Sequence, residues 1–156
     1  MRHSTIAIVC SALLMGCSSV RDSNLASPRS RTVDLPTGTI ELPSNFIYFQ
    51  GQGIDSYVGD FTRTDGGFRI EYDIGLMAGV ATSQPYKDIV SSNSMTIGKL
   101  TAIVVVTRWH FGAEWAVISF PDTAANFFAV IRNDSQLQTL KQIASSYKPK
   151  GDDSTK

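Results

Sequence analysis

An Asp-Gly dipeptide between two alternating segments is the feature of this sequence that most restricts its fold. Asp65-Gly66 separates residues 56–63 from residues 68–74, and Asp-Gly in this setting is typical of a tight β-hairpin turn. A shift of the pairing by one residue would set Phe61 opposite Glu71, so the apolar pattern itself selects the register. With a two-residue loop, the expected pairs place nearly all large apolar side chains on one face: Arg63 with Phe68, Phe61 with Ile70, Gly59 with Tyr72, and Tyr57 with Ile74.

The other face of this hairpin carries the candidate site residues. The same register sets Asp60 opposite Glu71, with Asp73 two positions further along, and like charges directly opposed on a sheet are destabilising. One hypothesis is a divalent-cation site, or a carboxylate acid and base pair assisted by His110. The other is a solvated acidic face that is balanced by Arg69 or by a basic residue elsewhere. We favour the second, because a regular hairpin lacks the glycine and spacing of a calcium loop.

Alternation and apolar runs predict further strands on both sides of the hairpin. Residues 39–42 and 46–49 read as two strands, and residues 96–110 as one central strand that is apolar on both faces. Residues 114–120 and 126–132 follow after turns, which predicts a meander of three antiparallel strands. Its aromatic residues are expected in the core rather than on a binding platform: Trp109, Trp115, Phe120, Phe127 and Phe128.

A C-terminal helix completes the predicted domain. Residues 75–94 have a weak pattern and are expected to form a loop, with room for one helical turn in residues 85–90. Ser135 and Gln138 fit a capping box, and Pro149 stops the helix that follows. The helix has an apolar face: Leu137, Leu140, Ile143, Ala144 and Tyr147. The fold class is therefore α+β, with an antiparallel sheet of about six to seven strands packed by a C-terminal amphipathic helix.

The order of the C-terminal half resembles PsbP-like and DcrB-like domains. The resemblance rests on the meander through residues 97–131 and on the helix 137–147, which ends in Ser-Tyr-Lys-Pro. It implies an antiparallel sheet flanked by helices and a role in binding or assembly, with no inherited active site. The alternative architecture is a rolled seven-stranded sheet plugged by the final helix.

The N-terminus predicts export and lipidation. A positive start and an apolar run over residues 5–15 precede Gly16, and about eleven apolar residues are too few to span a bilayer. Leu14, Gly16 and Cys17 resemble the lipobox of bacterial lipoproteins, which implies cleavage before Cys17 and its acylation. Several acyl chains together hold a protein stably on a membrane. In this family, Ser18 after the cysteine indicates the outer membrane of a Gram-negative envelope, facing the periplasm.

The predicted domain organisation follows from this signal. Residues 1–16 form the signal peptide, and the polar residues 17–32 form a lipidated flexible tether. Residues 33–149 form a single α+β domain, and residues 150–156 a disordered tail. Cys10 leaves with the signal and Cys17 takes the lipid, so the mature domain has no thiol for a disulfide or a zinc site. No cofactor is expected.

The charge balance limits the expected partners. The charges of fourteen basic and fourteen acidic residues cancel, and the sequence has no cluster of basic residues of the kind that binds a phosphate backbone. Nucleic acid is therefore not an expected partner. The sequence lacks the Gly-x-Ser-x-Gly motif of hydrolases, a phosphate-binding glycine loop and a paired-histidine metal motif. The expected function is a non-enzymatic envelope lipoprotein that binds the bilayer through Cys17 and another envelope protein through its domain. The alternative is a small cation-dependent binder or hydrolase that uses Asp60, Glu71 and Asp73.

Overall fold

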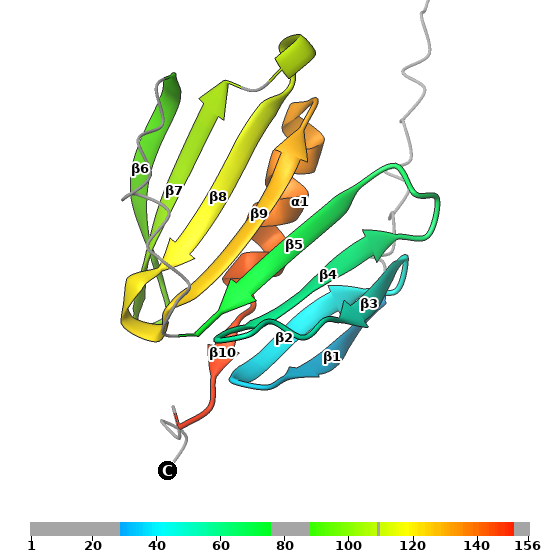
Figure 1. Cartoon of the computed structure of the whole chain (residues 1–156), viewed down its shortest axis with the longest axis vertical. Coiled ribbons are helices and arrows are strands. Elements are labelled where there is room, and N and C mark those ends of the chain that lie inside the picture. Colours follow the sequence, from blue (N-terminus) through cyan, green and yellow to red (C-terminus); the bar gives the residue numbers. More distant parts are fainter. Residues whose placement is uncertain (1–28, 76–87, 109, 152–156) are drawn as a thin grey trace, which may run out of the picture.

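Two antiparallel sheets and one α-helix make up the part of the chain that the computed structural model describes, residues 29–75, 88–108 and 110–151 (Figure 1). The larger sheet has seven strands in the order β3-β4-β5-β9-β8-β7-β6. In that order their bounds are Phe46–Gln50, Tyr57–Arg63, Arg69–Ile74, Ala125–Ile131, Glu114–Phe120, Leu100–Arg108 and Ile89–Ile97. The smaller sheet joins β1, β2 and β10, which are Ser30–Leu35, Gly38–Pro43 and Lys148–Pro149. This architecture confirms the α+β class in its broad form.

The helix and the small sheet pack against the same face of the large sheet. Figure 1 shows the helix α1, Asp134–Ser145, behind β9 and β5, and its apolar side chains join those of both sheets in one buried cluster. Burying this apolar surface supplies the main stabilising free energy of the domain. The cluster includes Leu42 from β2, Phe61 from β4, Ile70 from β5, Phe127 from β9 and Leu140 from α1.

The β4–β5 hairpin has the predicted register but a different turn. Phe61 pairs with Ile70 and Asp60 with Glu71, as the apolar pattern predicts. The turn is not the expected two-residue loop, because the Gly66 N–H donates to the Arg63 carbonyl at 2.8 Å and the Gly67 N–H donates to the Asp65 side chain at 2.8 Å. Gly66 has φ of 70°, a conformation that glycine adopts without strain.

The region before the meander differs from the prediction. Residues 96–110 are not one strand, because the chain turns at Gly98, which has φ of 59°, and Ile97 of β6 pairs with Leu100 of β7. The predicted loop is also wrong over residues 89–94, which belong to β6. This strand is rich in serine and lacks apolar alternation, so its pairing with β7 decides its conformation. Residues 85–87 lie outside the described residues.

The helix α1 begins at Asp134, and its N-cap is Asn133 instead of the predicted Ser135. Asn133, with extended φ and ψ of −160° and 163°, is the N-cap, and its side chain accepts from the Gln136 N–H at 3.0 Å. Gln136 in turn accepts from the Arg132 N–H at 2.8 Å. The capping pair is therefore Asn133 with Gln136 rather than Ser135 with Gln138, and the polar side chain nearest the strand end takes the N-cap.

The two ends of the described chain are fixed against the small sheet. The Ser146 hydroxyl accepts from the Glu41 N–H at 2.9 Å, and Lys148 pairs with Thr39. The Lys150 N–H donates to the Thr37 carbonyl at 2.8 Å. The first strand begins at Ser30, three residues before the domain start expected at residue 33.

The only helix longer than one turn in the described part of the chain has 12 residues. Among the described residues, no helix is long and apolar enough to cross a membrane.

The packing of α1 gives a stability prediction with a matched control. Leu140 is fully buried, whereas Leu137 on the same helix is only partly buried. We expect Leu140→Ala to lower the free energy of unfolding by about 2–5 kcal/mol, because it leaves a cavity in the core, and Leu137→Ala to cost clearly less. Urea denaturation of both variants measures the difference. Equal losses of unfolding free energy in the two variants would contradict the position of α1.

Candidate binding groove on the large sheet

The outward face of β5 carries the polar residues that the hairpin pattern predicts. Ile70, Tyr72 and Ile74 are buried on the helix side, so the alternate residues Arg69, Glu71 and Asp73 face the other way. Asp60 and Val58 of β4 lie beside them in the register, and β9 flanks β5 on the other side. The sheet therefore presents charged side chains on the face opposite α1.

Two adjoining depressions lie on this outward face. One has a volume of about 420 Å³ and is bordered by Phe49, Val58, Asp60 and Asp73. The other has a volume of about 300 Å³ and is bordered by Trp115, Val130, Arg132, Gly67 and Gln136. Three residues border both: Arg69, Glu71 and Phe128. We call the two depressions together the β5 groove.

Arg69 occupies the centre of the β5 groove and connects the two opposed carboxylates. Its Nη2 lies 3.0 Å from Oδ2 of Asp60, and its Nε lies 3.6 Å from Oε1 of Glu71. Asp60 also accepts from the Thr62 hydroxyl at 2.7 Å. This cation offsets the repulsion between facing carboxylates on adjacent strands. The arrangement agrees with the hypothesis of an acidic face balanced by Arg69.

Asp73 is the carboxylate that Arg69 does not contact. It lies between Val58 of β4 and Asn126 of β9, and its Oδ1 is buried without a hydrogen-bond partner among the described residues. A buried acceptor without a donor costs about 1–3 kcal/mol. Asp73 is also the one carboxylate of the three that forms no ion pair with a described residue.

The structure brings the three predicted carboxylates to one depression without forming a metal site. Asp60, Glu71 and Asp73 all border the larger depression, but no group of three or more acidic, histidine or cysteine side chains among the described residues could hold a metal ion. The side chain of His110 and the whole of Cys17 lie outside the described parts of the chain.

Aromatic side chains form the apolar wall of the β5 groove. Trp115 and Phe128 contact each other with ring centroids 5.2 Å apart, and Phe49 on β3 is 52% exposed. The prediction that the aromatics of the meander fill the core is confirmed for Phe120 and Phe127, both fully buried, and is wrong for Trp115 and Phe128, which border the groove. Side chains alternate between the two faces of a strand, so the sequence of residues 125–131 already indicated that Phe127 and Phe128 face opposite sides of the sheet. Trp109 lies outside the described residues.

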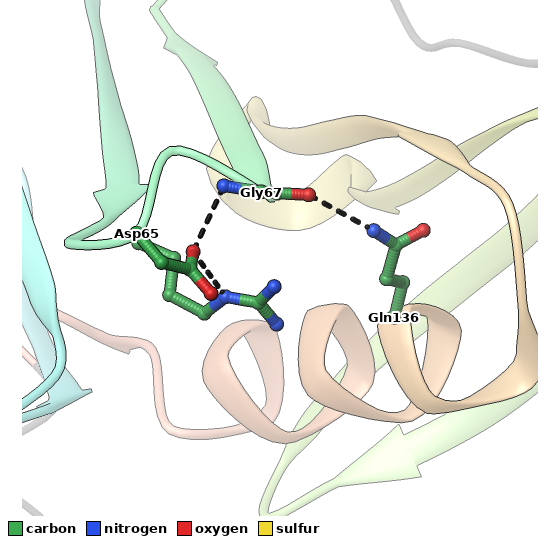
Figure 2. Close-up of polar contacts among 4 residues, drawn as sticks. Asp65, Gly67 and Gln136 are labelled. Carbon is green, nitrogen blue, oxygen red and sulfur yellow. Dashed lines mark hydrogen bonds and ion pairs between the residues drawn. The ribbon is translucent and has the colours of Figure 1, made fainter.

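Arg132 lies at the opposite end of the β5 groove from Asp73. Its position is fixed through Gln136, which accepts from the Arg132 N–H and donates through Nε2 to the Gly67 carbonyl at 3.2 Å. Figure 2 shows this second bond, together with the hydrogen bond from the Gly67 N–H to Asp65. The β4–β5 turn and the first turn of α1 are thereby joined at this end of the groove. Sequence reasoning did not identify Arg132 as a site residue.

The hydrogen bonds around the groove also set protonation states. The hydrogen bond from Arg63, followed by the one from the Gly67 N–H, lowers the pKa of Asp65, so this exposed turn carboxylate stays charged to a lower pH than an ordinary aspartate. Burial, followed by the hydrogen bond with Tyr48, raises the pKa of Tyr72 above its usual range. The Tyr72 hydroxyl therefore remains neutral at physiological pH.

Comparisons with known proteins give no independent assignment. No protein-family model matches the chain, and no curated protein or solved structure is detectably similar to it. The lipobox resemblance and the resemblance to PsbP-like and DcrB-like domains therefore remain predictions from the sequence.

The bridging role of Arg69 predicts a double-variant result. We expect Arg69→Gln to lower the free energy of unfolding by about 0.5–1 kcal/mol, because Asp60 and Glu71 then face each other without a cation. Adding Asp60→Asn removes one of the two charges and restores most of the loss. Urea denaturation of the two variants checks this. A double variant no more stable than the single one would contradict the bridge.

The same geometry predicts indifference to divalent cations. We expect about 10 mM Ca²⁺ or Mg²⁺ to leave the Tm of the full chain unchanged, since ligand binding would raise it and Arg69 already holds two of the three carboxylates. Thermal melts with and without EDTA measure this. A clear rise in Tm that Asp73→Asn abolishes would instead support the cation-dependent alternative.

Proposed function

We propose that this chain is a lipid-anchored envelope lipoprotein whose domain is a non-enzymatic binding or assembly module. Acylated Cys17 would hold it at the outer membrane of a Gram-negative envelope, with the domain facing the periplasm. The first strand begins at Ser30, thirteen residues after Cys17, and thirteen extended residues reach at most about 45 Å. A domain on such a tether stays close to the membrane and can still engage a partner in the space beside it.

The β5 groove is the observation that carries the binding part of this proposal. It combines exposed aromatic surface with charged groups of both signs, which is typical of recognition sites. Catalysis has weaker support, because Arg69 pairs with both Asp60 and Glu71. A carboxylate that is held in an ion pair is not free to contact a reacting group. The groove therefore favours binding over the hydrolase alternative.

The resemblance to PsbP-like and DcrB-like domains points in the same direction. It implies a role in binding or assembly and no inherited active site. The three-strand meander followed by a helix, which carries this resemblance, is present as β7, β8, β9 and α1. We propose the family relation on this order of elements, in preference to a rolled sheet plugged by its helix, since β3 and β6 are the two unjoined edges of the large sheet.

Lipidation can be tested with two cysteine variants. We expect the wild-type chain to incorporate labelled palmitate and to fractionate with membranes, and Cys17→Ala to lose both properties because the acyl chains have no attachment site. Cys10→Ala is the matched control, since it removes the other cysteine of the predicted signal and should keep the label. Membrane fractionation and fluorography of cells that express each variant measure this.

Two results would contradict the proposed anchor. One is a wild-type chain that takes up no labelled fatty acid. The other is a Cys17→Ala chain that still fractionates with membranes to the same extent as the wild type.

A further inference from the structure

The unpaired charges of the β5 groove have opposite signs and lie at opposite ends. Arg69 pairs with both Asp60 and Glu71 near its centre, which leaves one net negative charge there. Asp73 at one end and Arg132 at the other form no ion pair with any residue that the structure describes, and each borders only its own depression. The groove is therefore acidic at one end and basic at the other.

The strand register gives the distance between these two charges. Asp73 pairs with Asn126 on β9. Arg132 follows Asn126 by six residues, directly after the end of β9, and borders the smaller depression of the same groove. At about 3.3 Å per residue, the two ends lie roughly 20 Å apart along the sheet. This length corresponds to about six residues of an extended peptide.

We infer that the β5 groove binds a short zwitterionic peptide, with the ammonium group at Asp73 and the carboxylate at Arg132. The inference rests on the proposed function of the domain as a binding module and names its ligand class. The peptide would lie along β5 and β9 in an extended conformation. Its apolar side chains would contact Phe128 and Trp115 near the middle of the groove.

The chemistry at each end fits this ligand. The carboxylate of Asp73 borders the larger depression and forms no ion pair with any described residue, and an ammonium group beside it forms a charge-assisted hydrogen bond. A guanidinium group such as that of Arg132 binds a carboxylate through two parallel hydrogen bonds. A neutral glycan would leave both charges unpaired, and a polyanion would be repelled by Asp73. The charge pattern thus favours a ligand that carries both signs.

The test uses one hexapeptide in three forms. Ala-Leu-Ala-Leu-Ala-Leu with free termini, the same peptide with an acetylated N-terminus, and the same peptide with an amidated C-terminus are titrated into the full chain in detergent by calorimetry. We expect the free peptide to bind, and each blocked form to bind about three- to tenfold more weakly, because one charge pair is lost.

Two variants locate the ends of the peptide. With Asp73→Asn, acetylation should no longer weaken binding, whereas amidation still does. With Arg132→Gln, the pattern should reverse. Asp34→Asn, a substitution at an exposed residue of β1 outside the groove, is the matched control and should behave like the wild type. Because each comparison is made between peptides on one variant, a small loss of stability in that variant does not produce the result.

The inference is overturned if the free peptide does not bind, if blocking either terminus has no effect, or if the blocked peptides respond alike on all variants. Binding of a trimer of N-acetylglucosamine that Asp73→Asn weakens, without peptide binding, would also overturn it while leaving the binding module in place. The lipid label on Cys17 is read separately, so a failed anchor and a failed peptide site are distinguishable.

Discussion

The pairing of β5 with β9 is the interaction on which the rest of the structure depends. It joins the N-terminal hairpins to the C-terminal meander, and it sets Glu71 beside Phe128 and Tyr72 beside Phe127. On one face this register completes the core beneath α1, and on the other it places a carboxylate beside an aromatic ring. A shift by one residue would exchange the two faces, so the core and the β5 groove depend on the same set of backbone hydrogen bonds.

A second connection fixes the end of the helix layer. Gly38 lies so close to Tyr147 that an added Cβ would approach Cε2 of the ring to 2.7 Å, and the Ser146 hydroxyl accepts from the β2 backbone. The helix therefore runs directly into β10, which pairs with the small sheet. The last strand, β10, and the first strand, β1, both pair with β2, so the small sheet holds the C-terminal end of α1 in place.

Local patterns predicted the parts of this fold that local physics determines. The register of the β4–β5 hairpin, the strands of the meander from residue 100 onward and the apolar face of α1 all follow from alternation or helical spacing. The strand β6 was missed because Ser91, Ser92 and Ser94 carry no pattern and depend on β7 for their conformation. The site was predicted in part: the three carboxylates lie together as expected, but Arg132 joins them only through the pairing of β5 with β9 and the cap of α1, which a single sequence does not reveal.

The long separation between paired strands has a consequence for how the chain reaches this structure. When the N-terminus emerges first during synthesis, β3, β4 and β5 are available while β9 begins at Ala125, fifty-one residues after the end of β5 at Ile74. Until then the edge of β5 exposes unpaired backbone groups beside apolar side chains, which is a template for association with other chains. The chain is therefore most open to association with other chains before its final strands arrive, because β9 covers this edge of β5 only in the completed sheet.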